Sequence, residues 1–121
     1  MNLVADILTG AVALQHLFFL VLEMFLWTKP AGLKVFKMSP EEAKASAVLA
    51  KNQGLYNGFL AAGLVWGLIA ADPAQAFSIK AFFLLCVVAA GLFGGLTAHL
   101  SILLVQALPA AAALAALWVA R

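Results

Sequence analysis

The strongest constraint on the fold is the set of long apolar stretches that fills most of this chain. Of its 121 residues, 66% are hydrophobic and only 10% are charged, which is more apolar surface than a soluble domain of this size buries. A membrane-spanning helix needs about 20 largely apolar residues, so the chain has room for about four. We therefore predict an all-α integral membrane protein, a four-helix bundle that forms a single transmembrane domain over residues 1–121.

Prolines and charged residues separate the apolar stretches. Lys29-Pro30 ends the first, and Asp72-Pro73 ends the second. The helix of the second span is expected to begin near Pro40, behind a Ser39 cap and ahead of two acidic residues. Pro109 is expected to kink the last helix. The predicted spans cover about residues 3–27, 47–71, 77–96 and 102–120.

Basic residues set the predicted orientation. They gather in the connection 28–40 and at the start of the helix that follows it, and cytoplasmic loops carry such an excess of lysine and arginine. We predict that loop 28–40 and turn 97–101 are cytoplasmic and that the N- and C-termini lie on the non-cytoplasmic side. The lysines concerned are Lys29, Lys34, Lys37, Lys44 and Lys51.

The second predicted span carries a polar stripe. Asn52, Gln53, Tyr56 and Asn57 fall within an arc of roughly 140° on a helix that turns about 100° per residue. Polar groups at membrane depth are costly unless they face a partner or a wet cavity. We therefore predict that these four side chains, with Lys51 just outside them, bind a small amphipathic molecule.

Polar residues of the other spans are expected at the same depth. If the first two spans pack antiparallel, Glu23 lies level with Asn52 and Gln53. The fourth span enters the membrane from the same side, which places Gln106 at a depth similar to that of Tyr56 and Asn57. His16 lies seven residues before Glu23 on nearly the same helix face, about 10 Å deeper. These positions predict a polar pocket in the cytoplasmic leaflet, with Glu23 and His16 as candidate catalytic residues and Gln106 as a ligand-binding one.

Each of these residues also has a structural interpretation. In the structural interpretation, Glu23 pairs with Lys51 or accepts hydrogen bonds from Asn52. The polar stripe then serves only to form hydrogen bonds between helices. Tyr56 is then an anchor at the membrane interface, and His16 a packing residue. The single cysteine excludes a multi-thiolate metal site, so no metal is predicted, and the absence of a basic cluster argues against nucleic acid.

Two long stretches resemble the signatures of a known family. Leu14–Trp27 and Ala50–Ala61 are similar to motifs of a family of small four-span membrane proteins, catalogued as domain of unknown function thirteen-oh-four. The resemblance continues through Phe82–Val87 and Val105–Ala110, so it covers essentially the whole chain. The resemblance implies a four-span fold and, because it is to bacterial proteins, a location in the bacterial inner (plasma) membrane. It implies no function.

The architecture is also similar to that of the MAPEG proteins, membrane-associated glutathione and eicosanoid enzymes. That resemblance implies a homotrimer with a cytoplasmic-side site, and the stretch from Ala47 to Asn57 is loosely similar to the family's second-helix motif. The arginines that grip glutathione in that family are absent here, where the only arginine is Arg121. A second analogy, to the styrene oxide isomerases, implies haem held through a histidine, for which His16 is the candidate.

Three classes of function are compatible with these patterns. The protein is an oligomeric membrane enzyme or binding protein for a small amphipathic molecule, of which a haem-binding, isomerase-like protein is one version. Alternatively it is a structural or partner-binding helical bundle without a ligand. The third class is a small proton-coupled transporter in which Glu23 is loaded alternately by proton and cation, although the polar residues give no route to the outer face.

Overall fold

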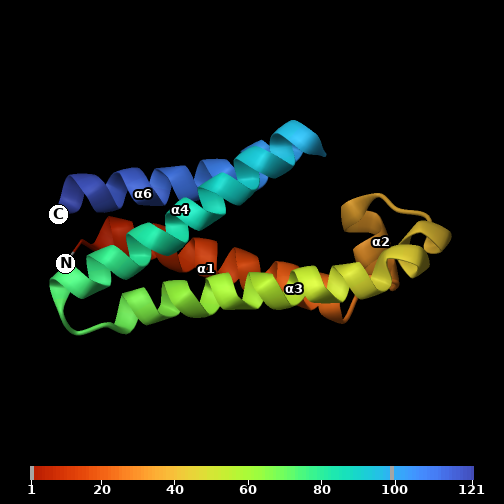
Figure 1. Ribbon diagram of the computed structural model, residues 1–121, viewed down its shortest axis with the longest axis horizontal. Helices are drawn as coiled ribbons and strands as arrows, with labels where there is room; N and C mark the ends of the chain where they lie inside the picture. Colours follow the sequence, from red (N-terminus) through yellow and green to blue (C-terminus); the bar gives the residue numbers. More distant parts are fainter. Residues whose placement is uncertain (1, 99) are drawn as a thin grey trace. The chain divides into compact units, whose positions relative to one another are not determined.

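Every regular element among the described residues is helical. The computed structural model describes residues 2–98 and 100–121 (Figure 1). The all-α fold class is therefore confirmed. The elements are α1 (Leu3–Met24), α2 (Pro30–Phe36), α3 (Pro40–Ile69), α4 (Pro73–Thr97), α5 (Leu100–Ile102), the π-helix η1 (Leu103–Ala107) and α6 (Leu108–Ala120).

The chain divides into two compact units. Unit 1 is formed by Met1–Ala13 and Leu60–Arg121, and unit 2 by Leu14–Phe59. The long helices α1 and α3 each contribute one part to each unit. The two units are described separately below.

Three helical stretches among the described residues are long and apolar enough to cross a membrane. They are Leu3–Met24, Pro73–Thr97 and Leu100–Ala120. They correspond to the first, third and fourth predicted spans, and their apolar surfaces fit contact with membrane lipid. The second predicted span lies in α3, which has 30 residues but is not among the three. The amides of Asn52, Gln53 and Asn57 make this helix less apolar than the others.

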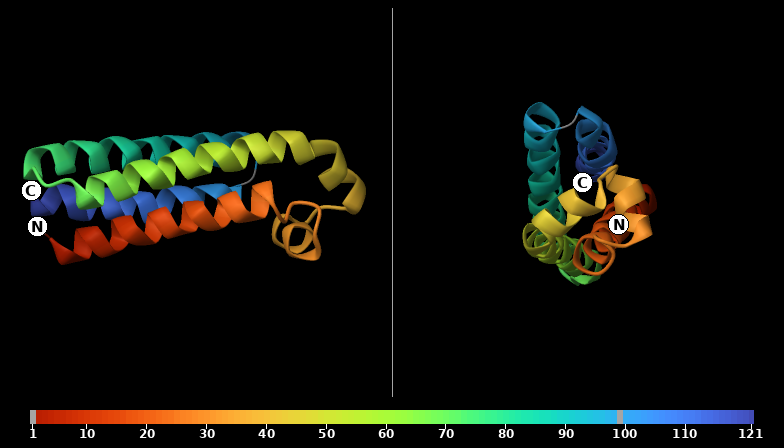
Figure 2. Two further views of the ribbon diagram at one scale, coloured as in Figure 1. Left: turned by 90° about the horizontal axis from the view of Figure 1, so that it is seen from below. Right: turned by 90° about the vertical axis from the view of Figure 1, so that its right-hand side faces the viewer.

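Unit 1 is held together by an apolar core between four helical segments. Figure 1 and Figure 2 show α4 and α6 running side by side. The first part of α1 and the last part of α3 complete the unit. Small side chains alternate with larger ones in the core, which lets helices approach closely. The fully buried members include Val12, Leu64, Leu84, Val87, Ala110 and Ala113.

Glycines of α4 allow its close approach to η1. A Cβ on Gly91 would lie 2.7 Å from both the Cβ and the backbone N of Ala107. η1 ends two residues before Pro109, which has no N–H to donate and whose ring crowds the preceding turn. The irregularity predicted at Pro109 therefore takes the form of a π-helix, in which the N–H of Leu108 donates to the carbonyl of Leu103.

The connections of unit 1 match the predicted breaks closely. α3 ends at Ile69 and α4 begins at Pro73, where Asp72 accepts a hydrogen bond from the N–H of Gln75 at 2.9 Å. Both neighbouring helices reach into the predicted turn 97–101, since α4 extends to Thr97 and α5 begins at Leu100. His99, expected in this turn, lies outside the described residues.

Unit 2 contains a short helix where a loop was expected. Part of the basic connection 28–40 forms α2, which begins at Pro30 and ends before Lys37 in the left-handed conformation, with φ of 53°. Gly32 allows α2 to pack closely against the segment that precedes it, since a Cβ at this position would lie 2.1 Å from the carbonyl oxygen of Leu26. The rings of Trp27 and Phe36 are 4.8 Å apart, and the Trp27 indole N–H donates to Ser46 Oγ at 3.0 Å. The connection is therefore folded against α3.

The start of α3 is a reciprocal cap, as the sequence predicts. The N–H of Ser39 donates to Glu42 Oε1 at 3.0 Å, and the N–H of Glu42 donates to Ser39 Oγ at 3.1 Å. Pro40 occupies the first turn, where its missing N–H costs nothing. Hydrogen bonds from Ser39 to the Glu42 carboxylate, first that of its backbone N–H and then that of its side chain, lower the pKa of Glu42 below its ordinary value of 4.5.

The cap predicts a pH-dependent helix end. Because the folded pKa of Glu42 lies below the unfolded one, its stabilisation is complete above the ordinary pKa and is lost as the pH falls through the lowered value. We expect hydrogen exchange in the first turn of α3 to speed up more in the wild type than in Glu42→Gln as the pH falls from about 6 to 3, after correction for intrinsic rates. Identical pH profiles for the two proteins would contradict this role.

Candidate functional site

A buried acid–amide pair joins α1 to α3 within unit 2. Glu23 is the second-last residue of α1, and Asn57 lies 34 residues later in α3. Asn57 Nδ2 donates to Glu23 Oε1 at 2.5 Å, and the two residues are only 6% and 8% exposed. A polar side chain is costly in an apolar environment unless it is hydrogen-bonded. Each member of this pair therefore supplies the partner that the other needs.

Glycines of α3 let the two helices approach at this point. A Cβ on Gly54 would lie 2.7 Å from Met24 Cγ and 3.1 Å from Glu23 Cβ, and one on Gly58 would lie 2.7 Å from Leu20 Cδ1. Close packing of this kind is typical of membrane helices with small interfacial residues. Upstream, Ala43 and Ala50 are buried on the same side of α3.

The small residues of α3 decide which polar residue meets Glu23. From the sequence, Glu23 was expected to lie level with Asn52 and Gln53, with Lys51 or Asn52 as its partner in the structural interpretation. That pairing is wrong, because the hydrogen bond comes from Asn57. Asn52 lies five residues before Asn57, which is about 140° around the helix. Once the face with Gly54 packs on α1, Asn52 is turned away.

The other predicted ligand-binding residues of α3 share an exposed surface. Lys51, Asn52, Gln53 and Tyr56 are all exposed, and the Tyr56 ring is 53% exposed with its edge towards Phe59 at 5.9 Å. We call these four residues the polar patch of α3. The structure thus splits the predicted stripe: Asn57 is bound to Glu23, whereas the polar patch is open. Exposed apolar side chains surround the patch, namely Val48, Leu49, Leu55 and Phe59.

His16 is fully buried in α1. Its exposure is 0%, and its ring meets that of Phe19 edge-on at 5.6 Å. It lies two turns before Glu23, on nearly the same face of the helix. Its roles as a catalytic residue or haem ligand stay predictions. Among the described residues, no group of three or more His, Cys, Asp and Glu is placed to hold a metal ion.

Gln106 lies in η1 and belongs to unit 1, whereas Glu23 and the polar patch belong to unit 2. Its membership of the same pocket therefore stays a prediction. A π-helix widens the turn at which its side chain leaves the backbone, and such turns are frequent at functional sites.

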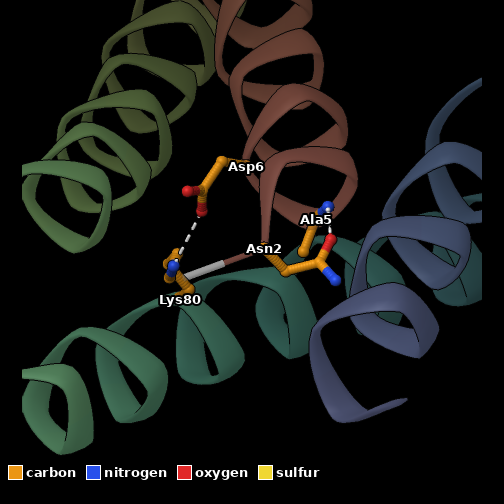
Figure 3. Close-up of polar contacts among 4 residues, drawn as sticks. All are labelled: Asn2, Ala5, Asp6 and Lys80. Carbon is orange, nitrogen blue, oxygen red and sulfur yellow. Dashed lines mark hydrogen bonds and ion pairs between the residues drawn. The ribbon is translucent and has the colours of Figure 1, made fainter. Parts of the chain in front are cut away.

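A charged pair in unit 1 was not predicted from the sequence. Lys80 Nζ lies 3.0 Å from Asp6 Oδ1, so α4 is tied to the first turns of α1 (Figure 3). Asn2 caps α1 by accepting a hydrogen bond from the N–H of Ala5 at 3.0 Å. The signal was present, since opposite charges stand near two span ends that were predicted on the same side of the membrane.

The protein is a small helical membrane protein with three long apolar helical stretches. A buried acid–amide pair joins one of them, α1, to the less apolar helix α3. The chain belongs to the family described as protein of unknown function (DUF1304), whose model matches residues 10–118. It is also 34% identical over 108 residues to the uncharacterized protein YpaA of Lactococcus lactis subsp. lactis (strain IL1403). The aligned region covers 88% of this chain and 89% of the relative. No solved structure matches the chain, and the similarity to MAPEG proteins is not shown.

Proposed function

We propose that the protein spans the bacterial inner membrane four times, with α3 as the second span, and forms a single transmembrane domain. The bacterial relative supports this location. In this proposal the connection that contains α2 is cytoplasmic and both termini are not, because the lysines gather in and after that connection. Such a topology places the polar patch of α3 in the cytoplasmic half of its span. Copies of the chain assemble into a homo-oligomer, a trimer by architectural analogy.

We infer that the polar patch binds a small amphipathic molecule. The observation that carries this inference is the exposure of Lys51, Asn52, Gln53 and Tyr56 on a helix surface that is otherwise apolar. Polar side chains at membrane depth are expensive when they face lipid, and they commonly mark a substrate path or a partner. A ligand with a polar head and an apolar body satisfies both kinds of side chain at once.

The Glu23–Asn57 pair positions the helix that presents the patch. Its hydrogen bond fixes the rotation of α3 against α1, so that Asn52 and Tyr56 stay exposed. In an enzymatic version of this proposal, Glu23 acts as acid or base in a reaction of the bound molecule, and His16 takes part in proton transfer. A fall in turnover without a fall in ligand content in Glu23→Gln is the result expected for that role.

A structural or partner-binding bundle is the second candidate. The buried pair and the glycine contacts of Gly54 and Gly58 favour it, because together they suffice to lock two helices in register. This candidate predicts that substitutions in the polar patch leave the small-molecule content of the purified protein at zero, as in the wild type.

Native mass spectrometry after mild extraction tests the proposal. We expect a small molecule to remain on the wild-type oligomer, and its occupancy to fall at least about tenfold in Gln53→Ala and Asn52→Ala. Gln75→Ala is the matched control, since it removes the same exposed amide from the first turn of α4. A ligand-free wild type, or equal occupancy in Gln53→Ala and Gln75→Ala, contradicts ligand binding by the patch.

The same preparation separates the remaining alternatives. An absorption spectrum with a Soret band that is lost in His16→Ala supports a haem protein. Proton flux into vesicles that depends on Glu23 supports a transporter. The oligomer mass measures the number of copies directly.

A further inference from the structure

A pocket of about 580 Å³ opens at one end of unit 1, and none of its lining residues belongs to the polar patch of α3. It lies where α1 and α4 begin and where α3 and α6 end. Its volume is in the range that small-molecule sites of proteins occupy. All of its lining residues belong to unit 1.

The charged side chains that line the pocket are Asp6, Lys80 and Arg121, two cations and one anion. Lys80 is neutralised by Asp6 at 3.0 Å, and the two side chains are 12% and 26% exposed. The Arg121 guanidinium lies 4.2 Å from the centre of the Trp118 ring and 6.0 Å from that of Phe77. No Asp or Glu side chain among the described residues pairs with it. One positive charge therefore remains without an acidic partner.

The rest of the lining is largely apolar, with one further donor. Ala5, Phe77 and Leu117 form apolar walls, and Asn2 also lines the pocket. Because the Asn2 Oδ1 accepts from the N–H of Ala5, its Nδ2 remains to donate outwards (Figure 3). A cation held over aromatic rings, a second donor and apolar walls are the features that recognise an anionic head attached to an apolar chain.

We propose that this pocket binds an amphipathic molecule with a single anionic headgroup, a phosphate or a carboxylate. Arg121 donates to the headgroup, Asn2 assists it, and the apolar walls cover the first part of the chain. The Asp6–Lys80 pair ties α1 to α4 beside the pocket. This site involves none of the residues of the polar patch, so it stands or falls separately from the proposed function.

Native mass spectrometry in a neutral detergent tests the site with dodecyl phosphate, dodecanoate, dodecyl maltoside and inorganic phosphate as probes. We expect dodecyl phosphate or dodecanoate to bind at least about tenfold more tightly than dodecyl maltoside and than inorganic phosphate. No preference over dodecyl maltoside overturns the anionic headgroup. Equal binding of inorganic phosphate overturns the role of the apolar walls and identifies a free-anion site instead.

Two variants locate the binding. Arg121→Gln removes the unpaired charge, and Ala74→Trp fills the pocket from an exposed position in the first turn of α4. Both are expected to weaken dodecyl phosphate at least about tenfold. Gln75→Trp adds the same ring one residue later, outside the lining, and retains wild-type affinity. Wild-type affinity in both Arg121→Gln and Ala74→Trp overturns the proposal, and wild-type thermal stability of the variants shows that any loss is not unfolding.

Discussion

Replacing Asn57 by leucine is expected to lower the free energy of unfolding by about 2 kcal/mol, because the Glu23 carboxyl group then stays buried without its donor. Leucine has a similar volume to asparagine, so the packing against α1 changes little. The measurement is thermal or denaturant unfolding in detergent, followed by the retention of the folded oligomer on size exclusion.

Two further variants separate the hydrogen bond from the packing. Glu23→Gln keeps a carbonyl oxygen that accepts from Asn57, so we expect a loss of less than about 1 kcal/mol. The double variant Glu23→Leu with Asn57→Leu removes both polar groups and is expected to recover much of the loss. A double variant that is as unstable as the sum of the two single leucine variants would show that the pair does not act as a unit.

Replacing Gly91 by alanine is expected to destabilise the protein by about 2 kcal/mol through overpacking. The new Cβ would lie 2.7 Å from the backbone N of Ala107 and 2.9 Å from its Cα, and these atoms are held in the π-helix η1. A flexible side chain is able to turn aside, whereas a backbone is not. Either α4 moves away from η1 or η1 rearranges.

Gly10 provides the matched control for Gly91. It lies within α1, and a Cβ there would meet nothing within 4 Å. The same change to alanine is expected to stabilise the helix by about 0.5–1 kcal/mol, because alanine has the higher helix propensity. Equal effects at the two positions would mean that the α4–η1 contact has no energetic importance.

Features with a local physical cause were predictable from the sequence. The Ser39 cap with Pro40, the break at Asp72-Pro73 and the irregularity at Pro109 each follow from the chemistry of a few neighbouring residues. Apolar length alone identified three of the four predicted spans. Helix α2 was missed because its seven residues depend on the close packing of Gly32 against the backbone of Leu26 and Trp27, which hydrophobic periodicity does not reveal.

The site was predicted in its members more than in its geometry. Glu23 and Asn57 were both named as residues of one polar pocket, but their pairing depends on which face of α3 packs against α1. The small residues Ala43, Ala50 and Gly54 decide that face. In an apolar helix such residues are common, so their spacing stands out less than that of the amides. The pocket of unit 1 was missed for a different reason. Asp6, Lys80 and Arg121 are widely separated in the sequence, and only the fold brings them together.

The most direct test of the four-span topology is the accessibility of cysteines placed at the two ends of α3. Lys34→Cys and Gln75→Cys, each in a Cys86→Ala background, put exposed thiols before and after this helix. In membrane vesicles treated with an impermeant maleimide, Lys34→Cys is expected to react only in inside-out vesicles and Gln75→Cys only in right-side-out ones. Reaction of both thiols from the same side would mean that α3 does not cross the membrane, and the proposed site in the cytoplasmic half of its span would fall with it.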